Sequence, residues 1–327
     1  MRSDIFRKAT FGAIGVGLAA TLGLATPAGA GAVPESSDPI KIAINEWTGQ
    51  HITAHVAGEI LKRMGYNVEF VTAGYYPQMT AMEDNSVTAA LEIWSSNIGE
   101  HYDKALASGN VEAIGDLGLV PVETWMYPAY VEEMCPGLPD WEALNACADI
   151  FATPETFPKG RFLDYPADWG TSNVDRIAAL GLNFVSVPSG SEGALVAEVK
   201  SAVARREPLL LMFWKPHWLH ASYDLKVLAL PTYAAGCYDD PSWGLNPDAT
   251  YDCDWERGHI KKTVWSGMKD KWPAAYRLLQ NYTLTNDDQN PMMKAIDVDG
   301  RDLEEVVSEW VDANEARWKP WVDDAMN

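Results

Sequence analysis

The sequence predicts an α/β protein of two lobes, each a mainly parallel sheet flanked by helices. Segments of strand and helix character alternate along the chain, which is typical of parallel sheets joined by helical crossovers. About 295 residues remain after an export signal at residues 1–32 is set aside, more than one compact core usually holds. We therefore expect two cores and a cleft between them, lined by loops that leave the strand ends.

The N-terminus, residues 1–32, is predicted to be a removable export signal. Three basic residues lie within the first eight, Phe11–Leu24 is apolar, and Ala28–Ala32 offers small residues for cleavage. A permanent membrane anchor is the alternative, but the apolar run is shorter than the roughly 20 residues that cross a bilayer. We expect the mature protein in the periplasm.

Lobe 1 is predicted to comprise residues 33–122 together with 222–327. Its first part alternates strand, helix, strand, helix and strand, at 40–45, 51–64, 67–71, 76–84 and 87–93. Its last part is predicted to return as helices that cover this lobe, at 260–271, 273–281 and 303–318.

Lobe 2 is predicted to comprise residues 123–221. An extended segment, a short helix and a strand come first, at 124–130, 141–147 and 161–165. Two helices and an apolar strand complete it, at 172–180, 191–206 and 209–214.

The chain is strongly acidic, with a formal net charge of −21 that becomes −23 without residues 1–32, which carry three basic residues and one acidic residue. Such a surface repels nucleic acid and anionic lipid. We expect no nucleic-acid partner and a soluble monomer.

The four cysteines form two local pairs, Cys135 with Cys147 and Cys237 with Cys253. In an oxidising compartment these spacings favour two disulfides that close short loops. A zinc site is the alternative, but the spacings are too long for a metal knuckle and no histidine lies beside either pair.

Four of the fourteen tryptophans stand at predicted strand ends or in the loops that follow them: Trp47, Trp94, Trp169 and Trp214. Two come from each lobe, so they can meet in the cleft. Several exposed indole faces suit a bulky cation that has no hydrogen-bond donors. The pattern predicts a binding protein for a small methylated amine, whose lobes close over the ligand. The other tryptophans are interpreted as packing residues.

Several segments resemble the substrate-binding proteins of ABC importers for glycine betaine, choline and related compatible solutes. The most specific match is Trp214–Trp218 (WKPHW) followed by Tyr223–Leu225 (YDL), and Glu46–Thr48 (EWT) and Gly118–Val131 are also similar. The resemblance implies a type II periplasmic-binding-protein fold, an aromatic box around a trimethylammonium group, and a membrane permease as partner.

The resemblance also implies roles for individual residues. Trp47, Trp94 and Trp214 correspond to members of the aromatic box, and Trp169 lies in a loop where some relatives place an aromatic residue. Glu123 stands where choline binders have tyrosine. A carboxylate there adds Coulomb attraction to a cation in a partly dry site.

The physiological ligand is predicted to be trimethylamine N-oxide, with glycine betaine second. Choline binders place an acidic residue two positions after the first box tryptophan, where this chain has Gly49. A betaine carboxylate would need donors such as His217 and would be repelled by Glu123. A protonated Glu123 could instead donate to the oxygen of the N-oxide. Choline and carnitine remain further alternatives.

Two residues expected at the ligand have structural alternatives. Tyr76 opens a helix near the cleft beside Tyr75, and either ring could reach the ligand. His217 is considered both as a ligand contact and as a structural histidine that ties the hinge.

Metal sites are weaker interpretations. His51 and His55 share a helical face with Glu59, but the segment HITAH lacks the glutamate of HExxH. Asp297, Asp299 and Asp302 resemble part of a calcium loop that ends in Ser308 rather than glutamate. We expect no cofactor, and a structural calcium ion is left unassigned.

A secreted hydrolase that uses the cleft is the alternative from another functional class. The sequence has no G-x-S-x-G, no phosphate-binding glycine loop and no HExxH. Glu132 and Glu133 are adjacent, so in an extended segment they would point to opposite faces. We expect a binding protein and not an enzyme.

Overall fold

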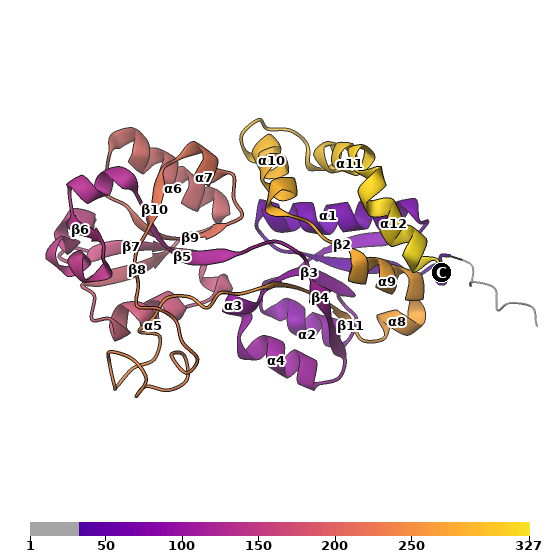
Figure 1. Cartoon of the computed structure of the whole chain (residues 1–327), viewed down its shortest axis with the longest axis horizontal. Helices are drawn as coiled ribbons and strands as arrows, with labels where there is room; N and C mark the ends of the chain where they lie inside the picture. Colours follow the sequence, from indigo (N-terminus) through magenta and orange to yellow (C-terminus); the bar gives the residue numbers. More distant parts are fainter. Residues whose placement is uncertain (1–32) are drawn as a thin grey trace, which may run out of the picture. The chain divides into compact units, whose positions relative to one another are not determined.

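The computed structural model describes residues 33–327, and the predicted export signal at residues 1–32 lies outside this range. Two five-stranded sheets organise the described chain (Figure 1). Helices flank each sheet, which confirms the predicted α/β fold of two lobes. We call the first sheet with its helices lobe 1, and the second lobe 2. Within residues 33–327, no helix has the length and apolar character needed to cross a membrane.

The first sheet has the strand order β2-β1-β3-β11-β4. Strands β1, β2 and β3 are parallel, and β11 runs antiparallel between β3 and β4. The apolar residues of β1 and β3 are buried because helices cover the sheet on both faces. The strands are β1 Ile40–Ile44, β2 Val68–Thr72, β3 Ala89–Trp94, β4 Val111–Asp116 and β11 Ile260–Trp265.

The helices of lobe 1 come from both ends of the described chain. In Figure 1, α1, α10 and α11 lie on one face of the first sheet, and α2 and α4 lie on the other. Both α10 and α11 pack against α1, so the C-terminal helices do return to this lobe. The helices are α1 Thr48–Arg63, α2 Pro77–Glu83, α3 Ser95–Ile98, α4 Glu100–Ala107, α8 Met268–Lys271, α9 Pro273–Asn281, α10 Asn286–Asp297, α11 Leu303–Ala313 and α12 Glu315–Ala325.

The second sheet has the strand order β10-β5-β9-β7-β8. Strands β7, β8 and β9 are parallel, whereas β5 is antiparallel to β9 and β10 is antiparallel to β5. Strand β10 lies inside residues 222–327, which the sequence assigned to lobe 1, yet it extends the second sheet. The strands are β5 Val122–Pro128, β7 Gly160–Asp164, β8 Phe184–Pro188, β9 Leu210–Lys215 and β10 Leu225–Val227, with the short β6 Pro136–Pro139 outside the sheet.

Lobe 2 contains helices of both α and 3-10 type. Helix α6 begins at a serine cap, because the Ser191 hydroxyl accepts from the Ala194 N–H. The helices are α5 Ser172–Ala179, α6 Glu192–Arg205, α7 Leu219–Ser222, η1 Ala129–Glu133, η2 Trp141–Ala146, η3 Ala148–Phe151 and η4 Ala167–Trp169.

Two predicted C-terminal helices were wrong in extent. Residues 260–271 form strand β11 and then the short helix α8, because apolar residues spaced at four and eight positions fit a buried antiparallel strand as well as a helix face. The predicted helix at 303–318 is two helices, α11 and α12, separated at Asn314.

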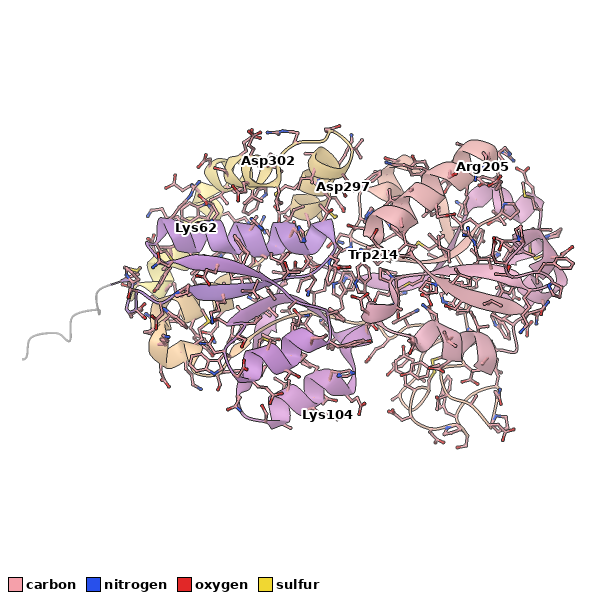
Figure 2. The ribbon with its side chains drawn as sticks, turned by 180° about the vertical axis from the view of Figure 1, so that it is seen from behind. Lys62, Lys104, Arg205, Trp214, Asp297 and Asp302 are labelled. Carbon is pink, nitrogen blue, oxygen red and sulfur yellow. A yellow bond between two sulfur atoms is a disulfide. The ribbon has the colours of Figure 1, made fainter. Side chains whose placement is uncertain are left out.

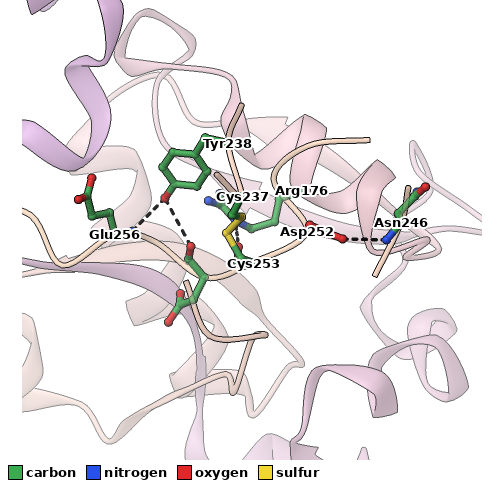
Figure 3. Close-up of a disulfide and its surroundings, with 8 residues drawn as sticks. Arg176, Cys237, Tyr238, Asn246, Asp252, Cys253 and Glu256 are labelled. Carbon is green, nitrogen blue, oxygen red and sulfur yellow. Dashed lines mark hydrogen bonds between the residues drawn. A yellow bond between two sulfur atoms is a disulfide. The ribbon is translucent and has the colours of Figure 1, made fainter. Parts of the chain in front are cut away.

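Both predicted disulfides are present. Cys135 is joined to Cys147 and Cys237 to Cys253, with Cα atoms 5.6 Å and 6.4 Å apart. Figure 3 shows the second disulfide beside Arg176, whose Nε donates to the Cys253 carbonyl at 2.6 Å. The disulfide closes a loop within the irregular segment before β11, and this hydrogen bond attaches the segment to helix α5.

Candidate ligand-binding site

A cavity lies where side chains from the two sheets meet. Its volume is about 30 Å³, and by the same measure one water needs roughly 10–15 Å³. The cavity therefore suits a compact guest. The lining residues are mainly aromatic: Trp47, Tyr75, Trp94, Asn97, Glu123, Tyr165, Trp169, Met212 and Trp214.

All four tryptophans predicted from strand ends line this cavity. Trp47 precedes α1, Trp94 ends β3 and Trp169 ends η4. Trp214, labelled in Figure 2, lies near the end of β9. Each is 5–7% exposed. Two come from each lobe.

The Trp169 indole stands between two others. Its ring centroid is 5.1 Å from that of Trp47 and 5.6 Å from that of Trp214, and both pairs are close to edge-to-face. Edge-to-face packing presents ring faces at an angle to one another, so three walls can face one space.

Lobe 1 side chains hold the backbone of Trp169. The Tyr76 hydroxyl donates to the Trp169 carbonyl at 3.1 Å, and Asn97 Nδ2 donates to the same oxygen at 2.7 Å. A lobe 2 wall of the cavity is therefore tied to two elements of lobe 1.

The indole N–H groups of Trp47 and Trp94 share one acceptor, Glu92. Trp47 Nε1 donates to Glu92 Oε1 at 2.8 Å, and Trp94 Nε1 donates to the same oxygen at 3.2 Å. Glu92 lies in β3 and is 2% exposed. The sequence offered a signal for it, a single carboxylate inside an otherwise apolar strand two residues before Trp94, which our sequence analysis did not use.

Glu123 faces Trp214 across two paired strands. The two residues are directly opposite in the β5–β9 register, so their side chains share one face of the sheet. The Ser96 hydroxyl from lobe 1 donates to Glu123 Oε2. Burial raises the pKa of Glu123 to about 7 despite this hydrogen bond, so the side chain can be neutral or charged near physiological pH.

Tyr165 is a lining residue that sequence analysis missed. It follows β7 and is 2% exposed, and its hydroxyl has no hydrogen-bond partner among the described residues. The neighbouring hydroxyl of Tyr75 is different, because it already accepts from the Trp94 N–H and donates to the Trp94 carbonyl. Tyr165 therefore offers a free buried donor at the cavity.

Two residues expected at the ligand lie elsewhere. Tyr75, and not Tyr76, lines the cavity, and the Tyr76 ring stacks on His101 with centroids 4.5 Å apart. His217 is buried outside the lining: its Nδ1 accepts from the Leu219 N–H, and its Nε2 lies 3.2 Å from a Glu192 carboxylate oxygen. The structural alternative for His217 matches this arrangement.

The histidines of the weak zinc interpretation have structural contacts. His51 Nε2 lies 2.5 Å from the Asn45 carbonyl, and His55 stacks on Phe70 with centroids 3.8 Å apart. Burial lowers the pKa of His55 to about 4. Glu59 pairs with Arg63.

The acidic residues of the calcium interpretation also have protein partners. Asp297 accepts hydrogen bonds from Thr48 and Trp218, and Asp302 caps helix α11. Over residues 33–327, no group of three or more metal-binding side chains is close enough to hold an ion.

The arrangement can surround a small cation. Indole faces attract a desolvated cation, Glu123 can add a negative charge or a proton, and Tyr165 can donate to an acceptor atom of the guest. Nothing in the lining pairs a nucleophile with a general base, because the titratable groups there are one carboxyl and two tyrosines.

Residues 38–313 match the family described as the substrate-binding domain of the ABC-type glycine betaine transport system. The trimethylamine N-oxide-binding protein of Pelagibacter ubique (strain HTCC1062) is 31% identical to this chain over 303 residues, which cover 90% of this chain and 94% of that protein. The glycine betaine/carnitine transport binding protein GbuC of Listeria monocytogenes (serotype 1/2a, strain 10403S) is 27% identical over 135 residues, 41% of this chain and 38% of that one.

Solved structures show the same fold. An ABC-transporter choline-binding protein in complex with choline has a TM-score of 0.72 at 21% identity, covering 89% of this chain and 93% of that one. Lactococcal OpuAC, closed on glycine betaine, has a TM-score of 0.69 at 18% identity, covering 87% and 99%.

Proposed function

Because the chain belongs to the family of substrate-binding domains of ABC-type glycine betaine transport systems, we propose that it captures trimethylamine N-oxide and delivers it to an ABC importer. Membership confirms the resemblance stated from the sequence. The chain is therefore a binding protein and not an enzyme. The proposal includes the periplasm as the place of capture, because the predicted export signal would carry the chain there.

The observation that carries the proposal is the convergence of four indoles and one carboxyl group on a single small cavity. A trimethylated nitrogen cannot donate hydrogen bonds, so aromatic faces are the groups that recognise it best. The cavity also contains few donors, which agrees with a ligand that presents one oxygen.

Two observations favour trimethylamine N-oxide over glycine betaine as the ligand. It is the more compact solute, and the cavity volume is only about 30 Å³. Its single oxygen needs a donor, and Tyr165 has a free buried hydroxyl. A betaine carboxylate would instead add a second negative charge beside Glu123.

The curated relative that covers most of this chain supports the same ligand, because it is a trimethylamine N-oxide-binding protein at 31% identity. Choline is disfavoured by Gly49, which offers no side-chain acceptor for a hydroxyl group. Gly49 has its own structural reason, since a Cβ there would lie 3.2 Å from the Gln289 side chain.

The proposal is tested by calorimetric titration of one protein preparation with trimethylamine N-oxide, glycine betaine, choline and carnitine. We expect one-to-one binding that is tightest for the N-oxide, with the ligand recovered unchanged. Tighter binding of glycine betaine would replace the proposed ligand, and no binding of any of the four would reject the proposed cage.

A further inference from the structure

We infer that Glu92 is a positioning residue of the ligand site, which holds the Trp47 and Trp94 indoles in their binding orientation before a ligand arrives. The inference rests on the proposed function, because it concerns the same aromatic cage. Glu92 itself is not among the residues that line the cavity. It would act through the two rings that do.

The hydrogen bonds of Glu92 use both carboxylate oxygens. Oε1 accepts from the two indoles, at 2.8 Å and 3.2 Å. Oε2 accepts from Thr53 Oγ1 at 2.7 Å and from Gln289 Nε2 at 3.2 Å. Four donors from four different positions therefore fix one carboxylate, and the carboxylate in turn fixes two rings.

The donors come from distant parts of the sequence. Thr53 lies in α1, and Gln289 lies in α10, 197 positions after Glu92. Gln289 Nε2 also donates to the Gly49 carbonyl at 2.8 Å, which ties α10 to the start of α1. A general packing role would not require all of these groups to converge on a single carboxyl group.

Glu92 is also a buried acid without a cation. It is 2% exposed, and no ion pair within residues 33–327 includes it. Burial raises the pKa of Glu92, although its four hydrogen bonds act to lower it. A cation held on the indole faces would favour the charged form of Glu92.

The same contacts would strengthen the rings as cation-binding surfaces. An indole N–H that donates to a carboxylate is polarised toward it, which makes the ring face more negative. The ring face is where the cation binds. Glu92 would therefore contribute both orientation and charge.

Lobe 2 supplies a contrast. The Nε1 atoms of Trp169 and Trp214 make no hydrogen bond to the part of the chain that the structure describes. Lobe 1 thus fixes its two cage indoles through their N–H groups, whereas the lobe 2 indoles are held by ring packing and by the backbone of Trp169.

The first test measures the unsubstituted protein, and substitutions serve only to assign its resonances. Indole ¹H–¹⁵N resonances of the ligand-free full chain are assigned with single Trp→Phe variants, and their hydrogen exchange is measured. We expect the N–H groups of Trp47 and Trp94 to exchange at least about tenfold more slowly than those of Trp169 and Trp214, because only the former pair has a buried acceptor. Equal exchange rates for all four would overturn the inference.

The second test is Glu92→Gln, with Asp164→Asn as the matched control. Asp164 is a buried carboxylate of the second sheet that accepts from Asn173 and Ser186, so its substitution reports the general cost of altering a buried acid. We expect E92Q to shift the Trp47 and Trp94 indole resonances. We also expect it to lower the affinity for trimethylamine N-oxide and for glycine betaine alike by at least about tenfold, because both ligands have the cationic head. D164N should leave those two resonances in place.

The outcomes separate this inference from the proposed function. Unchanged affinity in a folded E92Q protein would overturn the positioning role of Glu92 and leave the proposed aromatic cage intact. Failure of the wild-type chain to bind any methylated amine would reject the cage, and the exchange measurement would still decide whether Glu92 fixes the two rings. If E92Q does not fold, the exchange measurement alone decides the inference.

Discussion

At the scale of single residues, the site depends on aromatic surface, and the first prediction concerns Trp214. Its indole faces the cavity opposite Glu123 in the strand register. A desolvated cation on an indole face is worth about 2 kcal/mol, so Trp214→Ala should weaken trimethylamine N-oxide binding at least about tenfold. Calorimetric titration measures the loss. Trp243→Ala, outside the cavity, is the control and should bind normally; equal affinities for both variants would contradict the cage.

Glu123 predicts a pH dependence whose sign differs between ligands. Its pKa is raised to about 7 by burial. Trimethylamine N-oxide would accept a hydrogen bond from the neutral form, so its affinity should be full below that pKa and fall as the pH rises through it. Choline has no acidic group and gains from the charged form, so its weak affinity should rise over the same range.

The measurement for Glu123 is a titration of each ligand between pH 6 and pH 8, a range of about one unit on either side of the raised pKa. Glu123→Gln should remove the dependence for both ligands while keeping a neutral donor. Parallel pH profiles for the two ligands in the wild-type protein would count against the proton role of Glu123.

Tyr165 makes the prediction that concerns the ligand oxygen. Its hydroxyl is buried and unpaired in the described structure, and a hydrogen bond to a charged acceptor contributes about 1.5–3 kcal/mol. Tyr165→Phe should therefore lower the affinity for the N-oxide by about tenfold or more, whereas tetramethylammonium, which lacks the oxygen, should bind as before. Equal losses for the two ligands, measured by calorimetry, would indicate a packing role for Tyr165 instead.

At the scale of elements, the 3-10 turn that carries Trp169 depends on the glycine after it. Gly170 has φ +142°, and a Cβ there would lie 2.8–2.9 Å from the Tyr76 hydroxyl, Asn97 Oδ1 and the Tyr165 hydroxyl. Gly170→Ala should displace the turn and weaken ligand binding severalfold. Gly181→Ala is the control, because φ is +60° there but a Cβ would meet nothing within 4 Å. This substitution should lower the stability of the protein and leave ligand affinity unchanged. Thermal unfolding and titration of both variants separate backbone strain from the clash.

The elements also show how far sequence reasoning reached. The continuous apolar run of β9 was predictable because strands buried on both faces need no alternation. The strand within residues 260–271 was not predictable, since Lys262 lies inside strand β11 and is 0% exposed. Three backbone carbonyls accept from its ammonium group, and this non-local arrangement leaves no local pattern.

The residues of the candidate site also divide into those that the sequence could predict and those that it could not. The tryptophans at strand ends were predictable, because parallel strands bring their carboxyl ends to one edge. Tyr75 and Tyr76 could not be separated by sequence, since neighbouring residues at a helix start differ only in the direction of their side chains. Glu92 gains its importance from Thr53 and Gln289, which lie far from it along the chain, and Tyr165 from its place in the cavity lining; the lone carboxylate in an apolar strand is the one local sign of either.

At the scale of the whole molecule, contacts outside the cavity join the two lobes. The Thr48 N–H at the start of α1 donates to Glu192 of α6 at 2.9 Å, and Trp218 Nε1 donates to Asp297 at the end of α10 at 2.8 Å. The Thr48 hydroxyl also donates to Asp297 at 2.7 Å. Figure 2 marks Asp297 at the end of α10. These groups lie outside the ligand cavity, so they can stabilise the closed form without touching the ligand.

Trp218→Phe tests this role, because it removes one hydrogen bond between the lobes and keeps most of the ring. A lost hydrogen bond to a charged acceptor costs about 1.5–3 kcal/mol, and the loss applies only to the closed form. The ligand should therefore dissociate about tenfold faster or more, with its association rate nearly unchanged. Stopped-flow tryptophan fluorescence measures both rates. Trp310→Phe, on α11 of lobe 1, is the control that should leave both rates as they are. A Trp218→Phe protein that loses association rate instead would show that these contacts form before the ligand is enclosed.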